Sequence, residues 1–439
     1  MKTPVWDFVN QYAKADPIRF HMPGHKGKEY PFDITEISGA DVLYSATGII
    51  AESRKNASRL FGTYDTFYSA EGSTLAIKAM LALVTAGKEN KVVLASRNAH
   101  KAFIYGCALL DITPQWIYPS SFTDICACDI TAQQVEECFA NSLPCAVYIT
   151  SPDYLGNRAD IHAISRVCRK YGVPLLVDNA HGAYTAFLKE SEHPIHLGAD
   201  MCCDSAHKTL PVLTGGAYLH ISESGKGFAE NAESALSLFA STSPSYLILA
   251  SLDRCNAYLA DGYRDKLENT VKAVEKAKTV LLHAGYELIG SEKTKITLSP
   301  LKKGYTGKDI EKILIQHNVY PEFSSFAYTV LMITPENTEA EINAVTDLLT
   351  SLPDKESITK PDTDFSPKGE RQMSVREAML ADKETVSVKD SVGRICACPT
   401  VSCPPAIPIV ISGEIITESA VKLFEQYGTQ YIEVVKKSR

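Results

Sequence analysis

The sequence lacks an apolar run of the roughly 18 residues that a membrane-spanning helix requires. Its first ten residues include the charged or polar Lys2, Thr3, Asp7 and Asn10, so they lack the apolar run that a secretory signal needs. An excess of positive charge is also missing, because 52 acidic residues outnumber 44 basic ones and the formal net charge is −8. These absences predict a cytoplasmic protein that binds neither membranes nor nucleic acid.

Patterns typical of disulfides and metal sites are missing as well. The twelve cysteines occur in a chain without a secretory signal and are expected to be reduced thiols. His21 and His25 have the spacing of metal ligands on a helix, but Pro23 and Gly24 between them break any helix. The close cysteine pairs lack the two-residue gap of zinc sites: Cys126 with Cys128, Cys396 with Cys398, and Cys202 with Cys203. We therefore expect no metal.

The length of 439 residues and the 45% hydrophobic content indicate a globular protein of more than one domain. Strand and helix patterns alternate, which predicts an α/β fold with a large doubly wound, mostly parallel sheet. A helical stretch at about 249–284 is expected to connect to a smaller α+β unit, and residues 353–369 resemble a linker. The expected domains are a large domain at 1–260, a small α+β domain at 261–355 and a C-terminal α+β domain at 356–439.

Lys208 follows the short apolar run Met201–Cys203 on a loop of Ser, Thr, Pro and Gly. A lysine there must find a partner or lose its proton, and a desolvated lysine forms Schiff bases with carbonyl compounds. The alternative is a solvated loop lysine. A second stretch favours the first interpretation, because a buried strand ends at Asp178, and a carboxylate there can keep the pyridine nitrogen of pyridoxal phosphate (PLP) protonated. One crossover between the strands would bring both groups to the same rim of a parallel sheet.

Three other segments are candidates for the same site. Gly72-Ser73-Thr74 falls at a predicted helix start, which suits a phosphate group, although an ordinary N-cap is the alternative for Ser73. His100 follows a predicted strand, where its ring is either a satisfied polar group or a surface that stacks on a flat cofactor. The hydroxyl-rich loop 239–247 opens a helix and offers a second phosphate contact.

Taken in order, these segments resemble the Orn/Lys/Arg decarboxylase family, PLP enzymes of the aspartate-aminotransferase fold (PLP fold type I), in its short bacterial form. The resemblance covers essentially the whole chain. It is carried by these motifs: His21-Met-Pro-Gly-His-Lys-Gly27, Gly72-Ser-Thr74, Arg97-Asn-Ala-His-Lys101, Asp178-Asn-Ala-His-Gly182, Ser205-Ala-His-Lys208, Ser241-Thr-Ser-Pro244, Met373-Ser-Val-Arg-Glu-Ala378 and Pro404-Pro-Ala-Ile-Pro408.

The resemblance implies a role for each site residue. Lys208 would carry PLP, Asp178 would pair with its pyridine nitrogen, His100 would stack on the ring and His181 would lie beside it. A larger set would serve the phosphate: Ser73, Thr74, Ser205, His207 and, reaching the cofactor of a neighbouring subunit in a homodimer, Thr242 and Ser243.

The activity implied by the resemblance is decarboxylation of arginine, lysine or ornithine to the corresponding amine and carbon dioxide, as in polyamine metabolism. Another PLP enzyme of this fold, such as an aldolase or aminotransferase, is one alternative. A catalytically silent decarboxylase-like binding protein is another. A cationic substrate side chain needs an acidic acceptor, for which Glu322 and Asp153 are candidates, with surface solvation as the alternative for either.

Several positions depart from the family pattern. Asn179 replaces a usual Glu, and Asp153 and Leu155 stand where Thr and Tyr are common. The segment Leu43–Gly48 lacks the usual polar, His-rich stretch, and Ala406 replaces the glycine of a Pro-Pro-Gly motif. The cofactor anchors are intact, so these departures bear on the substrate more than on the cofactor.

Overall fold

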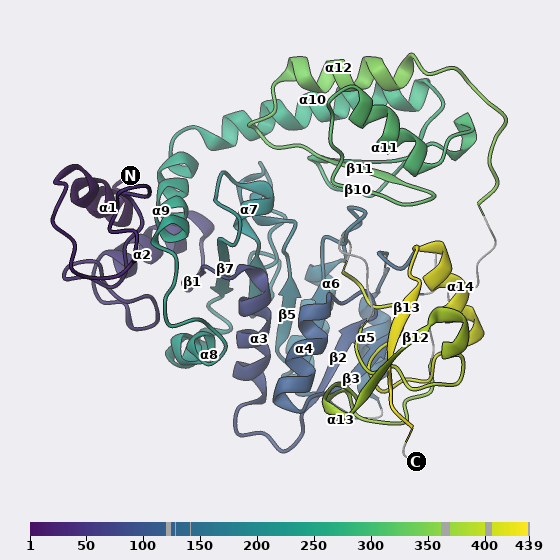
Figure 1. The fold of residues 1–439 in the computed structure, drawn as a ribbon, viewed down its shortest axis with the longest axis horizontal. Coiled ribbons are helices and arrows are strands. Elements are labelled where there is room, and N and C mark those ends of the chain that lie inside the picture. The colour runs from purple at the N-terminus through teal and green to yellow at the C-terminus, as the bar shows by residue number, and fades with distance from the viewer. Residues whose placement is uncertain (120–123, 128, 141, 361–368, 400–405, 438–439) are drawn as a thin grey trace. The chain divides into compact units, whose positions relative to one another are not determined.

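The structure is a computed structural model, and it describes residues 1–439 except 120–123, 128, 141, 361–368, 400–405 and 438–439 (Figure 1). The chain divides into two compact units. The first comprises residues 1–90, 145–151 and 161–267, and the second comprises residues 91–144, 152–160 and 268–439. Each unit therefore combines segments that are distant in the sequence.

Five strands of the first unit are arranged in the order β1-β7-β6-β5-β4. Strands β4, β5 and β6 run parallel, whereas β7 is antiparallel to both of its neighbours. Every residue of β5, β6 and β7 is buried, as expected for strands covered on both faces. The bounds are β1 Asp65–Ser69, β4 Ala146–Thr150, β5 Leu175–Asp178, β6 Met201–Asp204 and β7 Ala217–Ile221.

One predicted helical stretch differs from the helices that the structure contains. One prediction is wrong: the stretch 249–284 forms two helices, because the chain turns at Gly262, whose φ of 68° favours glycine. The second of these helices, α10, spans Tyr263–His283, and most of its residues belong to the second unit. The helices of the first unit are α1 Pro4–Lys14, α2 Ile49–Phe61, α3 Gly72–Thr85, α6 Ile161–Tyr171, α7 Ala206–Thr209, α8 Ala232–Ser237 and α9 Tyr246–Ala260.

In the second unit, helix α4 (Lys101–Leu110) connects two parallel strands, β2 (Val92–Ser96) and β3 (Thr113–Ile117). Helix α5 (Ala132–Phe139) follows β3. A separate four-stranded antiparallel sheet has the order β10-β11-β9-β8. Its strands are β8 Glu287–Ile289, β9 Lys295–Ser299, β10 Phe323–Ser324 and β11 Thr329–Met332, and its helices are α11 Gly307–Gln316 and α12 Glu339–Thr350.

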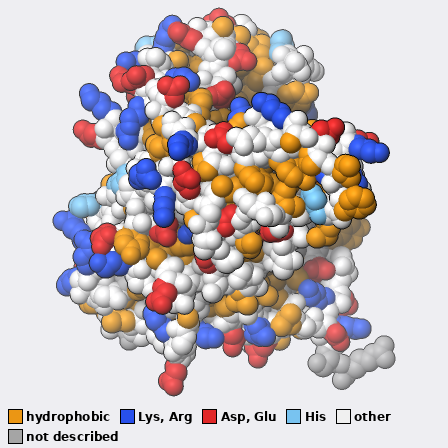
Figure 2. Space-filling view, turned by 90° about the vertical axis from the view of Figure 1, so that its left-hand side faces the viewer, with side chains coloured by type: hydrophobic (Ala, Val, Ile, Leu, Met, Phe, Trp, Pro, Cys, Tyr) orange, Lys and Arg blue, Asp and Glu red, His pale blue; other side chains and the backbone are white. Residues whose placement is uncertain are grey.

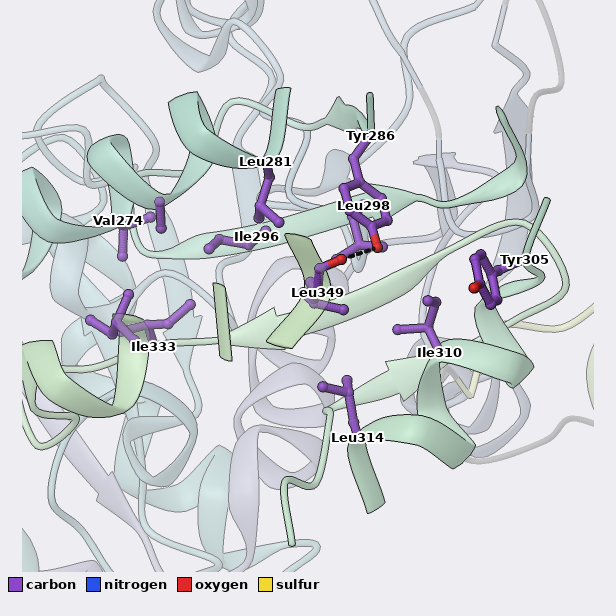
Figure 3. Packing of buried hydrophobic residues seen from close by; sticks show 12 residues of the cluster. Val274, Leu281, Tyr286, Ile296, Leu298, Tyr305, Ile310, Leu314, Ile333 and Leu349 are labelled. Carbon is purple, nitrogen blue, oxygen red and sulfur yellow. Dashed lines mark hydrogen bonds between the residues drawn. The ribbon is translucent and has the colours of Figure 1, made fainter. Parts of the chain in front are cut away.

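A compact apolar core lies between this sheet and its helices (Figure 3). Leu281 of α10, Leu298 of β9 and Leu314 of α11 all point into it and are buried. The hydroxyl of Tyr286 donates a hydrogen bond to the carbonyl oxygen of Leu349 at 2.8 Å, which satisfies the polar end of a buried ring. Strands β8 and β10 are only three and two residues long, too short to leave a periodic pattern in the sequence.

The C-terminal part of the second unit contains helix α14 (Glu418–Gln426) and strand β13 (Tyr431–Val435). Strand β13 pairs antiparallel with β12 (Lys383–Ser387), and helix α13 (Val375–Leu380) precedes them. Much of the predicted linker, residues 361–368, lies outside the described residues, as do Cys128, Pro404 and Pro405. The division into three domains stays a prediction.

Two further properties concern the described residues as a whole. Among their helices, none has the length and apolar character needed to cross a membrane. The ten cysteines that the structure describes are free thiols, and most of them are buried.

Candidate active site

The carboxylate of Asp178 lies at the end of β5 and is only 3% exposed. One of its oxygens, Oδ2, accepts a hydrogen bond from the hydroxyl of Tyr148 at 2.9 Å. The other, Oδ1, accepts from the backbone N–H of Ala180 at 3.2 Å and from the thiol of Cys203 at 3.6 Å. Burial raises the pKa of the Cys203 thiol, and the nearby Asp178 raises it further, so the thiol keeps its proton and donates it. Neutral donors therefore surround this carboxylate.

Lys208 and His181 lie next to each other at the end of neighbouring strands. Lys208 lies on the short helix α7, directly after β6, and its Nζ is 3.0 Å from Nε2 of His181. His181 belongs to the turn that follows Asp178. Because β5 and β6 are neighbouring parallel strands with Asp178 opposite Cys203, their carboxyl ends bring Asp178, His181 and Lys208 to the same rim. The predicted placement of Lys208 and Asp178 on one rim agrees with this geometry.

The start of helix α3 and the residue after β6 each supply a hydroxyl close to this rim. The hydroxyl of Ser205 donates to Oγ of Ser73 at 2.8 Å, and Ser73 lies in the first turn of α3. Glu71 is the N-cap residue, yet its side chain makes no capping hydrogen bond among the described residues. An uncapped helix start with two hydroxyls has the donor groups and the positive dipole end that a phosphate prefers.

The loop at residues 241–244 is tied to the same end of α3. The backbone N–H of Ser241 donates to a carboxylate oxygen of Glu71 at 2.7 Å, and Oγ of Ser241 accepts from the N–H of Ser243. Thr242 and Ser243 are exposed. The expected reach of these two residues to a neighbouring subunit stays a prediction.

Two further phosphate candidates lie next to these groups in the chain. The imidazole of His207 lies with Nδ1 3.0 Å from the carbonyl oxygen of Gly216, so a proton on Nδ1 is donated to that oxygen. Thr74 is half-buried in the first turn of α3. His207 is thereby oriented by the chain that leads into β7, and its contact with a phosphate stays a prediction.

His100 lies in the second unit, where it is the N-cap of α4. Its Nδ1 accepts a hydrogen bond from the N–H of Ala102 at 3.1 Å, so a neutral ring carries its proton on Nε2. This contact fixes the tautomer. Stacking of His100 on a cofactor stays a prediction.

The motif that contains His100 is joined to the C-terminal motif of the same unit. The guanidinium of buried Arg97 donates to the carbonyl oxygens of Pro408 and Ile409, each at 2.8 Å, and the N–H of Lys101 donates to the carbonyl oxygen of Ala406. Ala406 has a φ of 58°, a conformation that favours glycine and costs an alanine about 1–2 kcal/mol. The backbone thus keeps the glycine-type conformation despite the substitution.

The segment Leu43–Gly48 is organised by the carboxylate of Asp41. This carboxylate accepts hydrogen bonds from the backbone N–H groups of Thr47, Gly48 and Ile50 at 2.8–3.0 Å. Burial alone would raise the pKa of Asp41, but these N–H groups outweigh it and hold the pKa below its usual value. The segment therefore serves to start helix α2.

Asp153 and Glu322, the candidate acceptors for a cationic side chain, differ in their environment. Surface solvation is wrong for Asp153, which is buried and accepts from the N–H groups of Leu155 and Asn157 and from the Asn157 side chain. Burial raises the pKa of Asp153 to about 6, although these hydrogen bonds and the charge of Lys295 act against the rise. Glu322 is exposed and accepts a hydrogen bond from the hydroxyl of Tyr154 at 2.6 Å.

Sequence reasoning missed a buried polar cluster on the opposite face of the sheet. Its centre is Asp204, whose Oδ2 lies 3.0 Å from Nε2 of His193 and 3.3 Å from Nε2 of His220. Its Oδ1 accepts from the side-chain amide of Asn179 at 2.7 Å, and Oγ1 of Thr66 contacts Nδ1 of His220. Alternation along β5 explains the arrangement, since Asp178 faces one side and the next residue faces the other.

This cluster has the composition of a metal site, because ligand atoms of His193, Asp204 and His220 lie within 4.8 Å of one another. Contacts with one carboxylate oxygen account for the grouping, since His193 is hydrogen-bonded to Oδ2 of Asp204 and the ring of His220 approaches the same atom. The sequence contained one signal, because Asp204 directly follows an apolar run, and a carboxylate that is buried there needs hydrogen-bond donors. The histidines gave none, because His220 meets Asp204 through the pairing of β7 with β6, and His193 meets it from the loop that precedes β6.

Comparison with solved structures defines the class of protein. The lysine decarboxylase LdcF of Francisella novicida matches with a TM-score of 0.79 and 16% identity, over 99% of this chain and 81% of that chain. The constitutive lysine decarboxylase of Escherichia coli matches with a TM-score of 0.81 and 18% identity, over 99% and 82%. The predicted fold class, PLP fold type I with a mostly parallel central sheet, is confirmed.

The chain belongs to the Orn/Lys/Arg decarboxylase family. The model of the family's major domain matches residues 3–300, and the model of its C-terminal domain matches residues 357–437. An arginine decarboxylase of Halalkalibacterium halodurans is 32% identical over 453 residues, which cover 95% of this chain and 92% of the relative. An arginine decarboxylase of Bacillus subtilis is 30% identical over 455 residues, which cover 96% and 92%. The resemblance drawn from the motifs is confirmed.

Replacement of Asp204 by Asn tests the buried cluster. The new side-chain amide places its NH2 group opposite either the amide of Asn179 or the imidazole rings, which are donors themselves. We therefore expect the free energy of unfolding at pH 7 to fall by about 3 kcal/mol. Denaturant unfolding measures this loss. As a control, Asp65→Asn removes the partly exposed partner of Arg54 and is expected to cost less than about 1 kcal/mol. An equal cost for both variants would contradict the role of Asp204.

The same cluster predicts a loss of stability in acid. Burial lowers the pKa of His220, so the folded ring stays neutral while the unfolded one takes up a proton below about pH 6.5. Burial opposes ionisation of Asp204, but His193 and His220 outweigh it and lower its pKa. The stability that ionised Asp204 contributes to the folded state is therefore fully present above about pH 4 and is lost as the pH falls further. We expect the unfolding free energy of the unaltered protein to fall steadily from pH 7 to pH 4.

Proposed function

We propose that the protein is a PLP-dependent enzyme that decarboxylates a basic amino acid, arginine, lysine or ornithine, to the corresponding amine and carbon dioxide. The observation that carries this proposal is the cluster of Asp178, His181 and Lys208 at the carboxyl ends of β5 and β6. Arginine is the first substrate to test, because the relatives at 30–32% identity are arginine decarboxylases.

The residues present fit the chemistry of PLP. A primary amine is available on Lys208, a buried carboxylate on Asp178 and a hydroxyl pair at an uncapped helix start on Ser73 and Ser205. When bound, PLP acts as an electron sink that accepts the electron pair released as carbon dioxide departs. The donor set matches its aldehyde, its pyridine nitrogen and its phosphate group.

Each residue then has a definite task in the reaction. Lys208 would hold the cofactor and later return a proton from Nζ, and His181, 3.0 Å away, would exchange protons with that amine. Asp178 would hold a proton on the pyridine nitrogen, since its carboxylate is surrounded by neutral donors. Ser73, Thr74, Ser205 and His207 would bind the phosphate and fix the position of the ring.

We also propose that two copies form a homodimer, with Thr242 and Ser243 contributing to the partner's site. Supporting this, the N-terminal segment after α1 exposes large apolar side chains, and Figure 2, which views the side of the molecule where α1 and α2 lie, shows hydrophobic side chains gathered among charged ones. Exposed apolar patches on a globular protein mark interaction surfaces. The exposed residues are Ile18, Phe20, Met22 and Tyr30.

A cytoplasmic location and a part in polyamine-related metabolism complete the proposal. Free thiols at the described cysteines suit a reducing compartment. Decarboxylation of a basic amino acid yields a cationic amine, the class of compound from which polyamines are built.

The direct test is product analysis after PLP-loaded protein is incubated separately with arginine, lysine and ornithine. We expect one of the three to yield its amine and carbon dioxide. Keto-acid formation would instead indicate an aminotransferase, and no product from any of the three amino acids would favour a silent binding protein.

Lys208→Ala is expected to abolish both the activity and the visible absorbance of bound PLP. Asp178→Ala should remain folded and lose at least about 99% of the activity, because an unpaired pyridine is a poor electron sink. Near-normal turnover in either variant would contradict these roles.

The dimer is tested by replacing Phe20 and Met22 with aspartate and measuring mass in solution by light scattering. We expect a dimer for the unaltered protein and a monomer for the variant, because two buried charges destabilise an apolar interface. The matched control is Leu282→Asp, at an exposed position on α10. A variant that remains dimeric would contradict the proposed interface.

A further inference from the structure

Tyr148 lies outside the motifs that carry the family resemblance. It lies in the middle of β4, is fully buried, and its hydroxyl donates to Oδ2 of Asp178 at 2.9 Å. A buried phenol is large and apolar except at its oxygen, so the direction in which its hydroxyl donates a proton matters. Here that hydrogen bond ends on the carboxylate assigned above to the pyridine nitrogen.

The strand register explains why the two groups meet. Strands β4 and β5 are parallel, with Tyr148 opposite Leu176 and Thr150 opposite Asp178. Side chains two residues apart on a strand share a face, so Tyr148 and Asp178 are diagonal neighbours on the same face of the sheet. A diagonal neighbour is within reach only of a long side chain, which a tyrosine provides.

The direction of the hydrogen bond follows from the two acidities. A phenol is a far weaker acid than a carboxyl group, so the proton stays on the tyrosine and is donated to the carboxylate. A hydrogen bond to the ionised form of a buried carboxyl group favours that form. The other two donors, the N–H of Ala180 and the thiol of Cys203, lie at longer distances of 3.2 and 3.6 Å.

We propose that Tyr148 is a positioning residue for the decarboxylation, which holds the Asp178 carboxylate ionised and in one orientation toward the pyridine nitrogen of PLP. This inference rests on the proposed function and adds a residue from outside the recognised motifs. Tyr148 acts through Asp178, and its removal weakens the partner of the cofactor without removing that partner.

A double-mutant cycle on PLP affinity tests the inference. Equilibrium dialysis would give the dissociation constant of PLP for the unaltered protein, Tyr148→Phe, Asp178→Asn and the double variant. Because a hydrogen bond to a charged group is lost, we expect Tyr148→Phe to weaken PLP binding by about tenfold. In the Asp178→Asn background the same change is expected to cost less than about twofold, since the charge that it served is gone.

The matched control is Tyr218→Phe, which removes the hydroxyl of another buried tyrosine whose ring packs against Phe61 and Tyr68. It is expected to leave PLP affinity unchanged. An equal loss from Tyr148→Phe in both backgrounds would show a merely structural role and overturn the inference, as would no loss at all. Failure of the unaltered protein to bind PLP would overturn the proposed function together with the inference, whereas normal binding with no effect at Tyr148 would overturn the inference alone.

A second pair of variants covers the case in which Tyr148→Phe does not fold. Tyr148→Gln keeps an N–H donor, whereas Tyr148→Leu has no donor and a comparable size. We expect the Gln variant to bind PLP more tightly than the Leu variant, because only the former can donate to Asp178. Equal affinity, or tighter binding by the Leu variant, would overturn the inference.

Discussion

Burial of two carboxylates at the ends of neighbouring strands is the constraint on which the first unit depends. Removing an ionised carboxylate from water costs several kcal/mol unless donors replace the lost solvent. Asp178 obtains its donors from Tyr148, Ala180 and Cys203 on one face of the sheet. Asp204 obtains its own from the opposite face. Because successive side chains of a strand point to opposite faces, the two hydrogen-bond networks are separate. Lys208 lies at the rim of the sheet, after the end of β6.

This arrangement gives the departures from the family pattern a physical meaning. Asn179 donates its amide to Asp204, whereas a glutamate at that position would set a second carboxylate beside the first. Ala406 keeps a glycine-type backbone, and the segment after Asp41 starts helix α2. These substitutions are accommodated by local structure, and the residues proposed to hold PLP are not among them.

The sequence predicted the parts of the fold that follow from hydrophobic periodicity and from residues that start or end helices and strands. The strands that end at Asp178 and just before Lys208, and the helix start at Ser73, follow from local patterns and agree with the structure. The contacts of Tyr148 with Asp178, and of His193 and His220 with Asp204, could not be predicted, because they depend on strand order and register. The break at Gly262 was missed because helical periodicity continues on both sides of it. The extent of the domains and the roles of the predicted site residues stay predictions.

The central claim is that the amine of Lys208 carries the cofactor while Asp178 holds its ring. Reduction of the PLP-loaded protein with borohydride fixes the cofactor to the lysine that binds it, and mass spectrometry of the digested protein then locates that lysine. The account predicts a pyridoxyl group on the peptide that contains Lys208. A group on any other lysine, or none on this one under saturating PLP, would contradict it.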